Sequence, residues 1–75
     1  MEGYQIKNNI RKLRFENDEM TQSALAKKIG ATRQTIIAIE KEKYSPSLDM
    51  AFRIAVAFGV SITEVFWYEK LEETK

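Results

Sequence analysis

The chain has 75 residues, of which 44% are hydrophobic and 31% are charged, and its formal net charge is +1. This length accommodates a single domain, 1–75, and the composition is typical of a globular protein rather than a disordered one. The absence of cysteine and histidine excludes disulfides, Cys/His zinc sites, thiol nucleophiles and imidazole bases. No apolar run approaches the roughly 18 residues of a membrane span, and no signal-peptide pattern is present, so we expect a cytoplasmic protein.

Basic residues are concentrated in the first part of the chain. Residues 1–45 contain nine Lys/Arg against six Asp/Glu, whereas residues 46–75 contain three against five. This difference favours a nucleic-acid partner only weakly, because ordinary scatter of surface charge would produce a similar split.

The first two predicted helices are separated by a polar run at residues 16–19. Apolar residues at helical spacing place the first helix over about residues 5–17. Its stripe consists of Ile6, Ile10 and Leu13. Thr21 is a good N-cap for the second helix, and Gly30 is suited to end it in the left-handed conformation. The inward side of the second helix contains Leu25, Ala26 and Ile29.

Three more helices are predicted in the rest of the chain. Thr32 caps the third, and the motif Ser45-Pro46-Ser47 starts the fourth, because proline suits a first helical turn. Ser61 and Glu64 match the capping box of a fifth helix. The predicted core faces consist of Ile36 and Ile39 in the third helix and of Leu48, Ala51, Phe52, Ala55 and Phe58 in the fourth. No segment sustains a period-two alternation, so we expect no sheet and an all-α, compact five-helix bundle.

The second and third predicted helices have the spacing of a helix-turn-helix over residues 22–41. Two short helices joined at Gly30 must cross steeply, so a small residue is needed where they approach, and Ala26 supplies it. The apolar positions on both sides then close a small core between the helices.

The outer face of the third helix combines side chains that can read base edges. Arginine can bind guanine through two bonds, glutamine can bind adenine, and a small apolar side chain can contact a thymine methyl. A plain solvated face is the alternative, but an exposed isoleucine beside arginine and glutamine favours a groove. We predict that the base-reading residues are Arg33, Gln34, Ile37 and Ala38.

These segments resemble the Cro and phage-repressor-like helix-turn-helix proteins, the XRE family. The resemblance covers LRFENDEMTQ, TRQTIIAIE and KYSPSLDMAFRIAVAFGVSITEVF, which is nearly the whole chain. It implies a lambda-repressor-like DNA-binding domain that acts as a homodimer on an imperfectly palindromic operator. The third helices would enter successive major grooves about 34 Å apart.

The resemblance also implies roles for individual residues. The expected phosphate contacts are Gln22, Thr32, Thr35, Lys41, Lys43 and Tyr44. Gln22 is further expected to brace Gln34. Arg14 and Glu40 occupy the places of a buried ion pair that ties the first helix to the third, so we assign both to stability.

Two features depart from the family pattern. The loop between Arg14 and Gln22 is one residue longer and carries the acidic residues Glu16, Asp18 and Glu19. Glu42 stands where many relatives have glycine, so we expect it to strain the turn and to repel a phosphate.

The C-terminal aromatic residues have two interpretations. Trp67 and Tyr68, with Leu71, are candidates for a dimer interface on the last helix, because large amphipathic rings are enriched at interfaces. Alternatively, these side chains fold back over the first helix and complete the core. Residues 72–75 are predicted to form a flexible tail.

The sequence favours a DNA-binding transcriptional regulator, most simply a repressor, without a cofactor. Enzymatic activity has little support, since no glycine-rich phosphate loop and no paired carboxylates facing a pocket are evident. Two alternatives remain open. The chain could be an antitoxin or another protein-interaction module with a separate protein partner, or its fold could have lost DNA binding.

Overall fold

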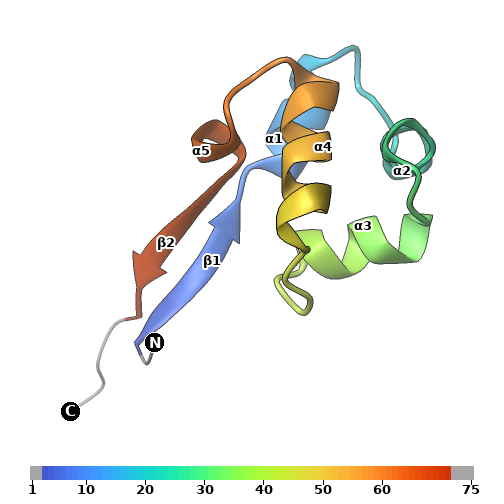
Figure 1. Ribbon diagram of the computed structural model, residues 1–75. Coiled ribbons are helices and arrows are strands. Elements are labelled where there is room, and N and C mark those ends of the chain that lie inside the picture. Colours follow the sequence, from blue (N-terminus) through green and yellow to red (C-terminus); the bar gives the residue numbers. More distant parts are fainter. Residues whose placement is uncertain (1–2, 72–75) are drawn as a thin grey trace.

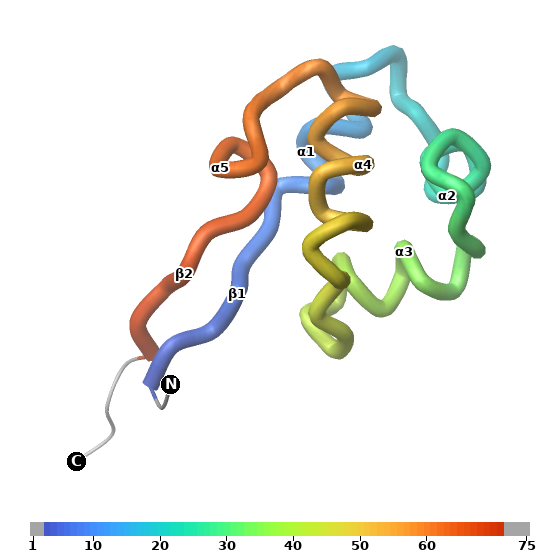
Figure 2. The backbone as a smooth tube through the Cα atoms, viewed as in Figure 1, coloured from blue at the N-terminus to red at the C-terminus, as the bar shows by residue number. Residues whose placement is uncertain are grey.

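The computed structural model describes residues 3–71 and shows a helical body from which a two-stranded ribbon extends (Figure 1). Its elements are β1 (Tyr4–Asn8), α1 (Ile10–Glu16), α2 (Gln22–Ile29), α3 (Arg33–Glu40), α4 (Leu48–Phe58), α5 (Ile62–Val65) and β2 (Phe66–Lys70). The ribbon gives the molecule elongated dimensions of 42 × 21 × 21 Å (Figure 2). The predicted tail, 72–75, lies outside the described residues. Within residues 3–71, no helix combines the length and apolar character needed to cross a bilayer.

The prediction of a first helix over residues 5–17 is wrong in its N-terminal part, because residues Tyr4–Asn8 form strand β1. The helix begins only at Ile10, where the side-chain oxygen of Asn8 accepts a hydrogen bond from the Ile10 N–H at 3.1 Å. The neighbouring Asn9 N–H donates to the carbonyl of Val65 at 2.9 Å, which fixes the end of the strand to α5.

The expectation that no sheet forms was also wrong. β1 and β2 pair in antiparallel register, with Tyr4 opposite Lys70 and Asn8 opposite Phe66. The fifth helix therefore ends at Val65, and the aromatic run that follows is extended, a conformation that aromatic residues favour. The all-α description holds for the helical body alone.

The predicted caps account for most of the helix boundaries. The Thr21 and Ser47 hydroxyls accept bonds from the N–H groups of Ala24 and Met50, and the capping box of Ser61 and Glu64 is formed. The fourth helix differs slightly from the prediction, because Ser47 is its N-cap and Pro46 precedes the helix.

The core lies between the five helices. Its fully buried large side chains are Ile10, Leu25, Ile36, Ile39, Ile54 and Val65. In α4 the predicted Ala51, Ala55 and Phe58 are buried. The prediction was wrong for Leu48 and Phe52, which are 70% and 50% exposed, because the apolar surface of α4 is wider than the face that the other helices cover.

Candidate nucleic-acid interface

Helices α2 and α3 form a bihelical unit whose turn is built from Gly30. This residue has a φ of 75°, a left-handed conformation that glycine adopts without strain. The Ala31 N–H donates to the carbonyl of Ala26 at 2.8 Å, and the Ala26 side chain is buried at the crossing. Figure 1 shows α2 end-on and α3 from the side, so the two helices cross steeply, as the spacing predicts.

The outer face of α3 presents the four predicted base-reading residues. Arg33 and Gln34 are exposed in the first turn, while Ile37 and Ala38 are half-buried one turn further along. At the start of the helix, the Thr32 hydroxyl caps α3 by accepting from the Thr35 N–H at 3.3 Å. The two threonine hydroxyl oxygens lie 3.0 Å apart, so both are held at the N-terminal end of α3.

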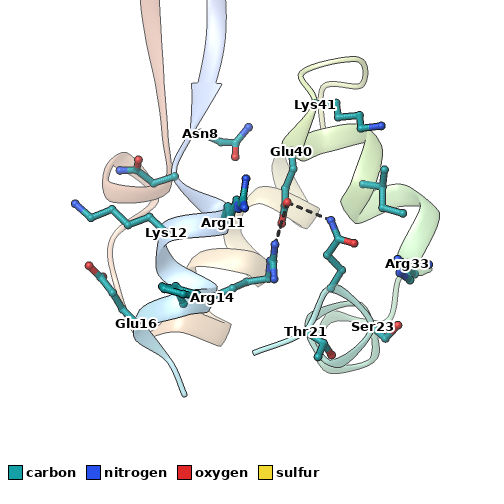
Figure 3. Close-up of a pocket in the computed structure, with 14 residues that line it drawn as sticks. Asn8, Arg11, Lys12, Arg14, Glu16, Thr21, Ser23, Arg33, Glu40 and Lys41 are labelled. Carbon is teal, nitrogen blue, oxygen red and sulfur yellow. Dashed lines mark hydrogen bonds and ion pairs between the residues drawn. The ribbon is translucent and has the colours of Figure 1, made fainter. Parts of the chain in front are cut away.

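Beneath this face, Arg14 connects α1 to the helix-turn-helix (Figure 3). Its guanidinium donates to both carboxylate oxygens of Glu40, at 2.7 and 3.1 Å, and to the carbonyl of Met20 at 2.9 Å. The Gln22 amide also donates to Glu40, at 3.2 Å, rather than bracing Gln34 as expected. The ion-paired side chains are only 15% and 11% exposed, so Glu40 is held by two donors in a poorly solvated place.

A groove runs between α1 and the helix-turn-helix, and it has basic side chains on both sides. Arg33 and Lys41 belong to the α3 wall, and Arg11 and Lys12 to the α1 wall. In Figure 3 Arg11 extends toward Glu40, whereas Lys12 extends away from the centre of the groove. The groove also reaches the first turn of α2, whose free backbone N–H groups favour anions.

Arg11 and Lys12 were missed as candidate site residues. A signal was available for Arg11, since it precedes Arg14 by three residues and thus shares its helix face. Lys12 could be placed only once the packing of α1 was known.

The turn after α3 is shaped by Glu42, which has a φ of 63°. The strained conformation expected there is therefore present. The carboxylate, however, accepts hydrogen bonds from two β1 side chains, the Gln5 amide at 2.9 Å and the Lys7 ammonium at 3.2 Å. Asn8 adds a bond from its side-chain amide to the carbonyl of Ile39 at 3.0 Å. Strand β1 thus holds the end of α3 and offsets the charge that would repel a phosphate.

The phosphate-contact candidates beyond this turn are accessible. Lys43 and Tyr44 are both exposed, and the Lys43 N–H donates to the carbonyl of Ala38 at 2.9 Å. The backbone of the turn is therefore fixed to α3, while both side chains extend into solvent.

Of the candidate interface residues at the C-terminal end, Trp67 and Tyr68 lie on strand β2 and Leu71 directly follows it, so none lies on a helix. Trp67, Tyr68 and Leu71 are 38%, 57% and 45% exposed, and the rings of Tyr68 and Tyr4 are 5.7 Å apart across the ribbon. Only Phe66 packs against the core. The alternative in which these side chains fold back to complete the core is therefore wrong.

Comparison with known proteins places this geometry in a family. The helix-turn-helix family model matches residues 10–65, from the start of α1 to the end of α5. The chain belongs to the XRE-type helix-turn-helix family.

Relatives of this family member are found in both archaea and bacteria. The chain is 55% identical over 64 residues to an uncharacterized HTH-type transcriptional regulator of Methanocaldococcus jannaschii. The aligned residues cover 85% of this chain and 96% of that protein. The chain is also 42% identical over 65 residues to the uncharacterized HTH-type transcriptional regulator YgzD of Bacillus subtilis. Here the aligned residues cover 87% of this chain and 97% of YgzD. The crystal structure of a "putative DNA-binding protein" from Bacteroides fragilis superposes with a TM-score of 0.73 at 27% identity, and covers 83% and 98% of the two chains.

Proposed function

We propose that this protein is a sequence-specific DNA-binding transcriptional regulator that inserts α3 into the major groove. The observation that carries this proposal is the exposed pair Arg33 and Gln34 at the start of α3, beside a groove with basic side chains on both walls. Arg33 would bind a guanine edge and Gln34 an adenine edge. Ile37 and Ala38, one turn later, would contact thymine methyl groups.

Phosphate contacts would hold α3 in register from both sides. On one side we assign the first turn of α2 with Gln22, together with Arg11 and Lys12 across the groove. The side chains assigned to the walls of the major groove are Thr32, Thr35, Lys41, Lys43 and Tyr44. Arg14 and Glu40 are assigned to the rigidity of the site, because their bonds are used within the protein.

We assign the active species as a homodimer on an imperfect palindrome, with the ribbon as its interface. A two-stranded sheet is marginally stable alone, and each strand of this one has an outer edge with free backbone groups. Trp67, Tyr68 and Leu71 add exposed apolar area beside that edge. We infer repression as the outcome, since blocking a promoter requires nothing beyond occupation of the operator.

Selection of bound duplexes from a random pool tests this proposal, because the enriched motif reports both the bases read and the half-site spacing. We expect two inverted half-sites separated by about one helical turn. Arg33→Ala should relax preference at one base position by roughly 1–3 kcal/mol, whereas the matched variant Lys43→Ala should weaken all sequences alike. Enrichment of no motif, or an identical effect of the two variants, would contradict the proposal.

The exposed aromatic ribbon also favours a second candidate, an antitoxin or another protein-interaction module. In that case Trp67 and Tyr68 would contact a different protein instead of a second copy. Purification of the native protein distinguishes the two: a stoichiometric second protein supports this candidate, and a dimer without one contradicts it.

A further inference from the structure

Helix α4 carries an apolar stripe that no other part of the described chain covers. Leu48, Phe52 and Val56 recur every four residues and are 70%, 50% and 78% exposed. At this spacing the three side chains lie on one side of the helix, beside the buried face. Single exposed apolar residues are ordinary, but three in one continuous stripe indicate a contact surface.

The stripe forms one wall of a groove with a basic opposite wall. Phe52 and Val56 line it together with the last turn of α2, which contributes Lys27 and Lys28. Asp49 and Arg53 also line the groove, but they neutralise each other through an ion pair of 2.8 Å. Neither lysine forms an ion pair within residues 3–71, so the groove combines an apolar wall with uncompensated positive charge.

The chain carries a surface of matching chemistry at the end of α1 and in the acidic turn that follows it. Phe15 is 72% exposed in the last turn of α1, and the exposed residues Glu16, Asp18 and Glu19 follow it along the chain. None of the three forms an ion pair with a described residue. We call residues 15–19 the acidic turn.

The acidic turn is held in one conformation. The N–H groups of Asn17 and Met20 donate to the carbonyl of Arg14, at 3.1 and 2.9 Å, and the Glu19 N–H donates to the carbonyl of Phe15 at 3.2 Å. Asp18 and Glu19 have φ angles of 57° and 54°, so the turn stores strain. A preformed turn loses little conformational entropy when it binds.

We propose that the acidic turn of one copy binds in the α2–α4 groove of a second copy. Phe15 would cover Phe52 and Val56, and the carboxylates of Asp18 and Glu19 would pair with Lys27 and Lys28. Charge complementarity selects this occupant, because the groove repels basic segments and the acidic turn has the opposite charge beside its apolar side chain. The two surfaces differ, so the contact is head-to-tail.

The head-to-tail contact uses none of the residues assigned to DNA contact and none of the ribbon. Phe15 and Glu16 of the acidic turn do line the groove beside α3, but the α2–α4 groove shares no residue with it. A dimer joined by its ribbon can therefore contact a neighbouring dimer. Resting here on the proposed function, we expect cooperative occupation of adjacent operators, because DNA raises the local concentration of the two surfaces.

Sedimentation of the full chain over a range of concentrations tests the contact without DNA. We expect species larger than the dimer, and we expect Val56→Ser, Lys28→Glu and Glu19→Lys each to raise the concentration they require by about tenfold or more. All three residues are exposed, so the fold should survive, and circular dichroism checks this.

Mixing charge-reversed variants provides the decisive comparison. Lys28→Glu mixed with Glu19→Lys should restore assembly, because each variant supplies one intact pairing for the other. Each variant alone, at the same total concentration, has like charges at positions 19 and 28 and should not. The proposal is overturned if the wild type forms nothing larger than a dimer at about 1 mM, or if the mixture assembles no better than the separate variants. Failure of this contact leaves binding to a single operator intact, whereas failure of DNA binding leaves the assembly intact.

Discussion

Among single residues, Arg14 has the largest structural role that the contacts show. It satisfies both oxygens of a poorly solvated carboxylate and also binds the backbone of the turn before α2. Its removal leaves Glu40 with Gln22 as its one remaining side-chain donor. A charge left in that position is costly because the protein cannot solvate it as water does.

Arg14→Met should therefore lower the free energy of unfolding by about 3–5 kcal/mol, the usual cost of breaking a buried ion pair from one side. The double variant Arg14→Met/Glu40→Leu should recover much of this loss, because no charge remains unpaired. Urea unfolding measures both. The exposed Arg11→Met serves as the control and should change stability by less than about 0.5 kcal/mol.

Glu42 shows how two residue-level effects can oppose each other. A left-handed conformation costs a non-glycine residue about 1 kcal/mol, whereas a partly exposed ion pair such as that of Glu42 with Lys7 contributes about 0–1 kcal/mol. Glu42→Gly should leave stability unchanged or slightly higher. It should also raise DNA affinity, since it removes a carboxylate near the assigned phosphate contacts. Urea unfolding and duplex titration test this, and a clear loss of stability would show that the bonds to β1 are worth more than the strain.

At the scale of elements, local sequence decides the helices and distant sequence decides the strands. Thr21, Thr32 and Ser47 identify helix starts because a capping hydroxyl binds a backbone N–H only three residues away. Strand β1 gives no such sign. Ile6 shares the helical spacing of Ile10, and it becomes extended only because β2, some 60 residues later, offers a partner.

The candidate site divides in the same way. The face of α3 could be predicted from its own eight residues, since the side chains that point outward follow from helical periodicity. The contact of Glu42 with Gln5 and Lys7 could not be predicted, because it depends on the course of a strand that the periodicity concealed.

The capping box at the start of α5 gives this element a dependence on pH. The pKa of Glu64 lies below its ordinary value, because the carboxylate accepts a bond from the Ser61 N–H and a second from the Ser61 hydroxyl. A carboxyl with a lowered pKa in the folded state stabilises the fold above its unfolded pKa, and this contribution disappears as the pH falls through the folded value. The stability difference between wild type and Glu64→Gln should thus be largest near neutral pH and vanish in acid. Thermal unfolding at a series of pH values measures it, and a constant difference would contradict it.

For the whole molecule, the ribbon decides how copies associate. Tyr68 lies on the ribbon surface, opposite Ile6 and with its ring tilted against that of Tyr4, and is 57% exposed. Tyr68→Lys should convert the proposed dimer to a monomer while the helical body remains folded, because a buried ammonium at an interface is strongly unfavourable. Sedimentation reports the state, and Val56→Ser is the matched control that should remain dimeric.

The pairing of Tyr4 with Lys70 also sets an order of folding events. The helices form from contacts between nearby residues, whereas the ribbon closes a loop that includes nearly the whole described chain, and that closure carries an entropic cost. The two strands can therefore pair only after the helices have brought Asn9 close to Val65. The hydrogen bond between the Asn9 N–H and the Val65 carbonyl forms first and places the strands side by side. The same order runs in reverse on opening, so amide protons of β1 and β2 should exchange with solvent well before those of α3 and α4.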